Sequence, residues 1–215
     1  MTRENKTLVL LGVFVAGVIL ANLLGTKIAD FGFFVASVGI FMYPTTFVAT
    51  DIVAEVFGRK KAATFVLVGL IANGMLFGMV ALSIWLPPAA RYPSNEAFLE
   101  VFNPSLRIIG ASIIAFLIAQ THDVLAFEFW KKITKGKFLW LRNNASTIVS
   151  QFLDSMIFMF LAFYLATPEY TVEFILALTI PYWLLKVLIA VADTPLVYLG
   201  VRWLRSDEEL DQQGT

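Results

Sequence analysis

Long apolar runs are the feature that most constrains how this chain can fold. A helix needs about 20 apolar residues to cross the roughly 30 Å hydrocarbon core of a bilayer. Runs of that length cover residues 7 to 29, 62 to 86, 106 to 130, 144 to 166 and 171 to 204. With 59% hydrophobic and only 15% charged residues and a mean hydropathy of +0.78, the chain has the composition of an integral membrane protein.

A further apolar stretch is less regular. Residues 31 to 57 are interrupted by Gly32, Gly39 and Pro44. Because proline is tolerated in the first turn of a helix but not in its interior, we expect a helix over about residues 44 to 58. The sequence therefore predicts an all-α integral membrane protein with six transmembrane helices and a broken, hairpin-like segment before the second.

Basic residues gather in a few short segments, which sets the orientation. GRKKA, KKITKGK and the two ends of the chain carry most of them, whereas the outer loop 87 to 103 carries Arg91. Six spans place both termini and these basic segments on one side, which the positive-inside rule makes cytoplasmic. Arg107 is expected to snorkel to the outer interface. We expect residues 1–215 to form a single multi-pass transmembrane domain in the cell inner (plasma) membrane.

Acidic residues inside the apolar runs are the main functional candidates, because ionisable groups within a bilayer are costly unless they are paired or face a cavity. From the helical rise, Asp51 and Asp123 lie roughly 12 Å from the nearest cytoplasmic basic residue of their spans. Asp193 lies roughly 14 Å and Asp154 roughly 18 Å from theirs. The four carboxylates are therefore expected near one level, close to the membrane midplane.

Other polar side chains share helix faces with these acids, three or seven residues away. The predicted substrate-binding residues are Asn22, Asp51, Gln120, Asp123, Gln151, Asp154, Lys186 and Asp193. Lys186 is the one cation near the membrane midplane, so several carboxylates need a different partner, one rich in N–H groups. An amine or a guanine-like edge supplies such groups, and Tyr182 and Trp183 can stack on a planar ring.

Several of these residues have a plainer interpretation. Asn22 and Asn73 serve equally well as helix-packing hydrogen bonders or as ligand contacts. His122 is expected to be packed or hydrogen-bonded rather than a metal ligand, and Glu55 is expected to pair with Arg59 one turn later.

Small residues recur at four-residue spacing in the first span. Gly12 and Ala16, and Gly17 and Ala21, are such pairs. They permit close helix packing, either inside the chain, in a homodimer or against another membrane subunit.

Several function classes are not supported. The chain has no cysteine and a single histidine, which argues against thiolate or histidine-built metal sites and leaves no cofactor implied. There is no phosphate-binding Gly-Lys-Ser/Thr loop, no arrangement typical of an intramembrane protease, and no basic domain for nucleic acid. We therefore expect a membrane protein that is not an enzyme and takes a small molecule, either an amine or a purine-like molecule with a guanine-like edge.

Four segments in order across nearly the whole chain resemble the queuosine precursor transporters of the vitamin uptake transporter type. They are YPTTFVATDIVAEVFGRKKA, AQTHDVLAFEFWKK, RNNASTIVSQFLD and WLLKVLIAVADTPLVYLG. The resemblance implies a six-helix importer of 7-cyano-7-deazaguanine and 7-aminomethyl-7-deazaguanine. The family pattern falls on Asn22, Asp51, Gln120, Asp123, Ser146, Thr147, Asp154 and Lys186, and its last span on Asp193, Thr194 and Pro195. A substrate-binding membrane subunit of an energy-coupled vitamin transporter is the alternative.

Overall fold

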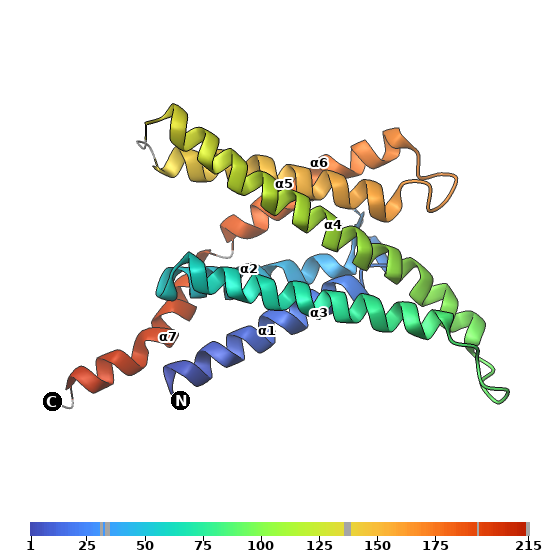
Figure 1. Cartoon of the computed structure of the whole chain (residues 1–215), viewed down its shortest axis with the longest axis horizontal. Helices are drawn as coiled ribbons and strands as arrows, with labels where there is room; N and C mark the ends of the chain where they lie inside the picture. The colour runs from blue at the N-terminus through green and yellow to red at the C-terminus, as the bar shows by residue number, and fades with distance from the viewer. Residues whose placement is uncertain (31, 33–34, 136–138, 193, 214–215) are drawn as a thin grey trace. The chain divides into compact units, whose positions relative to one another are not determined.

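The computed structural model of the chain is built mainly of long helices (Figure 1). It describes the backbone of residues 1–30, 32, 35–135, 139–192 and 194–213. Within these, the side chains at 35, 120, 123, 124, 127, 128, 130, 131, 139–147, 190, 191, 194 and 207–213 lie outside the description. The elements in chain order are α1 (Arg3–Leu23), β1 (Ile28–Asp30), β2 (Val35–Ser37), η1 (Val38–Met42), α2 (Tyr43–Phe57), α3 (Arg59–Trp85), α4 (Asn95–Ile133), α5 (Leu139–Phe163), α6 (Val172–Ala192) and α7 (Thr194–Gln213).

Five of the described helices are long and apolar enough to cross a membrane. They are Arg3–Leu23, Val38–Phe57, Arg59–Trp85, Asn95–Ala119 and Val172–Ile189. A shorter apolar helix, Ile148–Phe163, lies in α5, where the sequence predicts the span 144 to 166. The described residues thus form a helical multi-span membrane protein, and a sixth span stays a prediction.

The first of two compact units comprises Met1–Leu106 and Lys186–Thr215, and Figure 1 shows its helices α1, α2 and α3 side by side. Its core cluster joins residues of α1, α2, α3 and α7, namely Leu10, Phe14, Ala49, Ile52, Val53, Phe65 and Leu204. Glycines allow the close approach: Gly69 lies against the Phe14 ring, and Gly200 lies against Ile52. Inside a bilayer such van der Waals packing stabilises helix association, since no water is excluded there.

A short antiparallel strand pair connects α1 to α2. Ala29 of β1 lies opposite Ala36 of β2, and η1 follows directly. The Ser37 hydroxyl accepts a hydrogen bond of 3.2 Å from the Gly39 backbone N–H, which satisfies one of the donors at the start of η1. Gly39 packs against the backbone of Ala21, where no Cβ would fit. These contacts bring the start of α2 against the end of α1.

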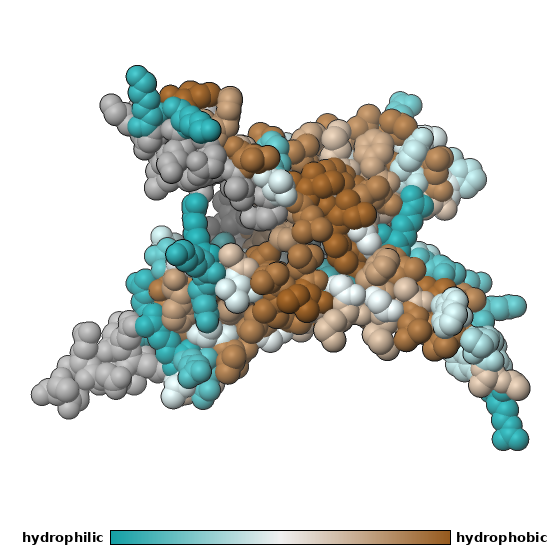
Figure 2. Space-filling model, in the orientation of Figure 1, coloured by the Kyte–Doolittle hydropathy of each residue, from teal (hydrophilic) through white to brown (hydrophobic). Residues whose placement is uncertain are grey.

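The junction between α2 and α3 is a single residue, Gly58, with a positive φ of 84°. The basic triplet Arg59, Lys60 and Lys61 therefore forms the first turn of α3 rather than a loop between spans. Figure 2 shows the result on the surface of α3, which is hydrophobic along its middle and hydrophilic where the helix begins. The cytoplasmic location inferred for these charges from the sequence stays a prediction.

The C-terminal helix α7 is joined to α1 by Lys6, whose side chain is only 4% exposed. Its Nζ donates hydrogen bonds to the Trp203 carbonyl oxygen at 2.9 Å and to the Ser206 hydroxyl at 2.8 Å. The same Nζ lies 5.5 Å from the centroid of the Trp203 ring. The run 171 to 204, read from sequence as one span, corresponds to α6 and α7, which lie on either side of residue 193, outside the described residues.

The second unit, Arg107–Leu185, packs α4 against α5 through Ile108, Ala111 and Ala162. Arg107 donates from Nε to the Leu161 carbonyl oxygen at 2.8 Å and from a terminal nitrogen to the Tyr164 carbonyl oxygen. These carbonyls lie at the end of α5, where helices leave acceptors unsatisfied. Arg107 thus binds the end of a neighbouring helix, a contact that the snorkelling expectation did not include.

Helix α4 begins earlier than the sequence suggested. The expected span ran from 106 to 130, after an outer loop at 87 to 103, whereas α4 covers Asn95–Ile133 and contains Pro104. Ring contacts help this first part to be helical, since the Phe98 and Phe102 centroids lie 4.3 Å apart one turn from each other. At 1.5 Å per residue α4 is about 58 Å long, well beyond the hydrocarbon thickness. Within it, Asn95–Ala119 is long and apolar enough to cross a membrane.

Candidate functional site

Lys186 on α6 is the most deeply buried charged side chain among the predicted site residues that the structure describes, with 2% of its surface exposed. Its Nζ lies 4.7 Å from the centroid of the Tyr43 ring at the start of α2. An ammonium on an aromatic face is stabilised by the ring quadrupole, most strongly where water is excluded. The contact fixes a cation beside the first turn of α2.

Asp51 lies on the face of α2 that points away from the core of its unit. The core face carries Ala49, Ile52 and Val53, all buried, whereas Asp51 is exposed. Tyr43 lies two turns earlier on the same outward face. This face therefore carries a carboxylate near its middle and, at its start, the aromatic ring on which the Lys186 ammonium lies.

Asn22 and Asn73 connect α1 with α3. Both residues are buried, at 7% and 6% exposure, and the Asn22 amide nitrogen donates to the Asn73 side-chain oxygen at 3.3 Å. The same nitrogen donates to the Val18 carbonyl oxygen at 2.9 Å. The structure thus confirms the helix-packing role that sequence allowed for these amides. A ligand contact by Asn22 stays a prediction.

Gln151 and Asp154 belong to the second unit. They lie three residues apart on α5, both partly buried, so they share one helix face as expected. The Gln151 backbone carbonyl oxygen accepts a hydrogen bond of 2.9 Å from the fully buried Ser155 hydroxyl, which leaves the side-chain amide out of this contact. A carboxylate and an amide side by side can accept and donate hydrogen bonds to the same heterocycle.

Aromatic pairs join α5 to α6 beside these two polar residues. The Phe158 and Tyr182 rings stack at 6.2 Å with an interplanar angle of 17°, and Phe152 meets Trp183 edge to face at 5.6 Å. The stacked Phe158 ring covers one face of Tyr182, and Tyr182 as a whole is only 8% exposed. The expectation that Tyr182 offers its ring face to a ligand is therefore not supported on that side. The buried Nε1 of Trp183 has no hydrogen-bond partner within the described residues.

His122 is hydrogen-bonded. The sequence predicts that it is either packed or hydrogen-bonded. Its Nδ1 lies 3.0 Å from the hydroxyl of Ser150, which is 5% exposed and lies on the neighbouring helix α5. In the part of the chain that the structure describes, no group of three or more histidine and carboxylate side chains is placed to hold a metal ion.

Some predicted site residues lie outside the described residues. The side chains of Gln120 and Asp123 on α4 and the whole of Asp193 belong to this group, as do the side chains of Ser146, Thr147 and Thr194. Their part in a site stays a prediction.

Two contacts of the first unit had no signal in the sequence. The Lys186 ammonium lies on the Tyr43 ring, and Lys6 binds α7. In both contacts the partners are far apart along the chain. The distribution of basic residues indicated only that Lys6 is a cytoplasmic charge. Nothing in the sequence distinguished Tyr43 from the other aromatic residues. Residue spacing reports which side chains share a helix face, but not which helices meet.

The model of a family described as putative vitamin uptake transporter matches residues 37–200. A Bacillus subtilis (strain 168) protein named "Probable queuosine precursor transporter" is 30% identical over 189 residues, covering 87% of this chain and 81% of that protein. An Escherichia coli (strain K12) protein named "Queuosine precursor transporter" is 26% identical over 153 residues, covering 71% of this chain and 66% of that protein. No solved structure matches the chain.

Proposed function

Since the chain belongs to the putative vitamin uptake transporter family, we propose that it carries queuosine precursors across the cell inner membrane. The family is one of transporters, and the several apolar helices make this chain a multi-pass membrane protein that handles a small molecule within the bilayer. The observation that carries the proposal is the relationship to the Bacillus subtilis protein, which extends over 81% of that protein's length.

The proposed substrates are the free bases 7-cyano-7-deazaguanine and 7-aminomethyl-7-deazaguanine. The proposed architecture is six spans with both termini in the cytoplasm, of which five described helices already have the required length and apolar character. A deazaguanine presents neighbouring N–H groups along one edge, and such an edge pairs well with a carboxylate.

In the first unit, Asp51 is the proposed acceptor for this edge. Its exposure on the outward face of α2 supports the assignment, because a carboxylate that binds a transported ligand has to be reachable. Lys186 is the proposed cationic partner, and its burial against Tyr43 supports a fixed position for the charge. Asn22 and Asp193 complete the set proposed from this unit.

In the second unit, Gln151 and Asp154 are proposed as ligand contacts, together with Gln120 and Asp123. Support comes from the shared face of the first pair on α5 and from the aromatic rings beside it.

Replacing Asp51, Asp123 or Asp154 with Asn keeps the shape of the side chain and removes its charge. Near-normal uptake by all three variants at normal abundance would refute an acid-lined site.

A substrate-binding subunit that depends on a separate ATPase module is the second candidate. Gly17 of α1 packs inside the chain, against Thr46, whereas Gly12 has open space around it. Open small residues on a membrane helix suit a homodimer or a partner subunit. A binding subunit alone would capture the base without accumulating it inside sealed vesicles.

The experiment that tests the proposed function measures queuosine in tRNA. Cells that can neither make nor otherwise import the precursor would express this chain and receive nanomolar 7-cyano-7-deazaguanine or 7-aminomethyl-7-deazaguanine. We expect queuosine to return with at least one of the two bases. Its absence with both, when the protein is present in the membrane, would contradict the proposal.

A further inference from the structure

The outward face of α2 carries three side chains in a row, Tyr43, Phe47 and Asp51. They are spaced four residues apart, so each is the neighbour of the next on the helix surface, about 6 Å further along the axis. The helix buries its opposite side, through Ala49 and Val53, against the core of the first unit. The row is therefore presented away from that core.

The first ring of the row is already engaged. The Lys186 Nζ lies over the Tyr43 ring, and the Phe47 ring meets Tyr43 at a centroid distance of 5.7 Å and an angle of 52°. Because these two rings are tilted and not stacked, the Tyr43 ring does not lie flat on the Phe47 ring. Phe47 and Tyr43 are both partly exposed, but the Tyr43 ring already carries the Lys186 ammonium. Phe47 is therefore the ring of the row that we consider for a ligand.

The position of Asp51 one turn later determines what such a ligand would be. Side chains of a helix lean toward its N-terminus and cover the turn before their own Cα. The Asp51 carboxylate is therefore expected to lean over the turn that carries Phe47. A planar heterocycle whose N–H edge pairs with this carboxylate extends over the Phe47 ring, whereas a flexible or spherical amine gains little there.

We propose that Phe47 is a specificity-determining residue, on whose ring a planar heterocycle stacks while its N–H edge is held by Asp51. This inference rests on the proposed function, and it adds a residue and a selection rule to it. The rule is that substrates must combine a flat aromatic ring with adjacent N–H donors. Stacking on an aromatic side chain does not discriminate between flat heterocycles, because each of them has a π-face. Phe47 is therefore expected to select for a flat ring, and Asp51 for the edge that carries the N–H donors.

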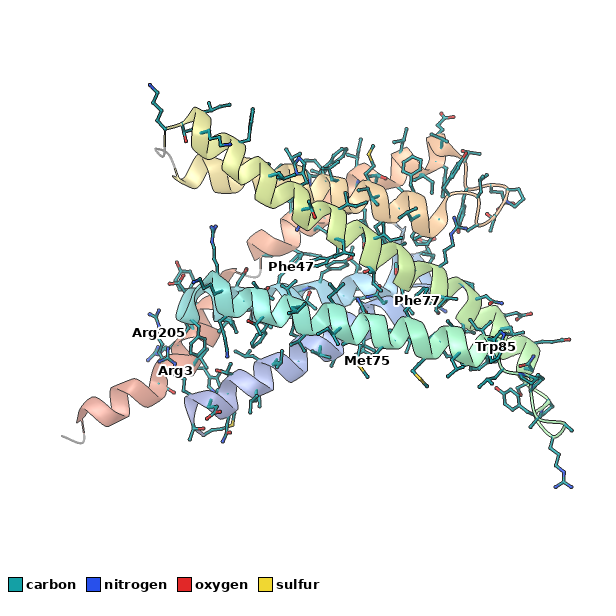
Figure 3. All side chains as sticks on the ribbon, viewed as in Figure 1. Arg3, Phe47, Met75, Phe77, Trp85 and Arg205 are labelled. Atoms are coloured by element: carbon teal, nitrogen blue, oxygen red, sulfur yellow. The ribbon has the colours of Figure 1, made fainter. Side chains whose placement is uncertain are left out.

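The test compares uptake kinetics of 7-cyano-7-deazaguanine in vesicles that contain the full-length chain. Phe47→Leu and Phe47→Met remove the ring and keep an apolar side chain on the helix, and Phe47→Trp keeps a ring. Phe77→Leu on α3 is the matched control, since Phe77 is an exposed membrane-helix aromatic outside the row (both residues are labelled in Figure 3). Protein abundance in the membrane is measured for every variant.

We expect Phe47→Leu and Phe47→Met to raise KM about tenfold while the maximal rate per transporter stays within twofold, because stacking contributes to binding. Phe47→Trp and Phe77→Leu should keep the wild-type KM. An unchanged KM in Phe47→Leu and Phe47→Met would overturn the inference, as would loss of maximal rate alone. Should the wild-type chain itself not transport the base, the proposed function fails. Should it transport while the Phe47 variants keep their KM, only the stacking role fails.

Discussion

Lys6 is expected to hold α7 against the rest of the first unit, and Lys6→Met tests this directly. Methionine keeps the length and apolar stem of the buried side chain but removes the ammonium, which donates to the Trp203 carbonyl and the Ser206 hydroxyl. Hydrogen bonds from a charged group contribute about 1.5–3 kcal/mol each. The cost of taking the ammonium out of water offsets part of this, which leaves a net loss of about 2 kcal/mol when the contacts are removed.

The assay uses the absence of natural cysteines in the chain. A cysteine placed at Leu204, which is 0% exposed in the core cluster, reacts with a water-soluble thiol reagent only when α7 opens. A loss of about 2 kcal/mol raises the open population, and hence the labelling rate, about 30-fold. Lys60→Met, at an exposed position in the first turn of α3, serves as the control and should change nothing. Equal labelling rates with and without Lys6 would refute the reasoning.

Three further perturbations follow from the helix contacts. Gly200→Ala should destabilise the first unit by about 1–3 kcal/mol, because the added methyl meets Ile52, and thermal unfolding of the purified protein would show it as a lower Tm. A double-mutant cycle with Asn22→Leu and Asn73→Leu should give a coupling of about 0.6 kcal/mol, and strict additivity would contradict the hydrogen bond between them. Arg107→Ala should cost about 1–3 kcal/mol by leaving two carbonyls at the end of α5 without this donor, with Tm again the measurement and Arg107→Lys partly restoring it.

Much of the helical framework was predictable because hydropathy reports length and position directly. The runs at 7 to 29 and 62 to 86 correspond to α1 and α3, and Pro44 marked the start of α2 to within one residue. The first part of α4 was not predicted, because the segment around Phe98 is too polar on average to look like a span and contains a proline. The Phe98–Phe102 ring contact supports the helix there, and hydropathy does not register contacts of this kind.

Less of the candidate site was predictable. Spacing correctly gave the shared face of Gln151 and Asp154, since that is a property of one helix. The burial of Lys186 against Tyr43 depends on how two helices meet and had no counterpart in the sequence. Membrane depth, likewise, was estimated for each acid separately, and it does not tell which of them face one another.

Uptake of 7-cyano-7-deazaguanine by the purified chain in sealed liposomes tests the central claim most directly. We predict saturable entry of the base that depends on the protein, and a clear loss of uptake in Asp51→Asn, which keeps the side-chain shape and removes the charge. Captured base without entry, from a correctly folded chain, would contradict independent transport and favour a subunit that requires a partner. Neither capture nor entry of either deazaguanine would contradict the proposed substrate class itself.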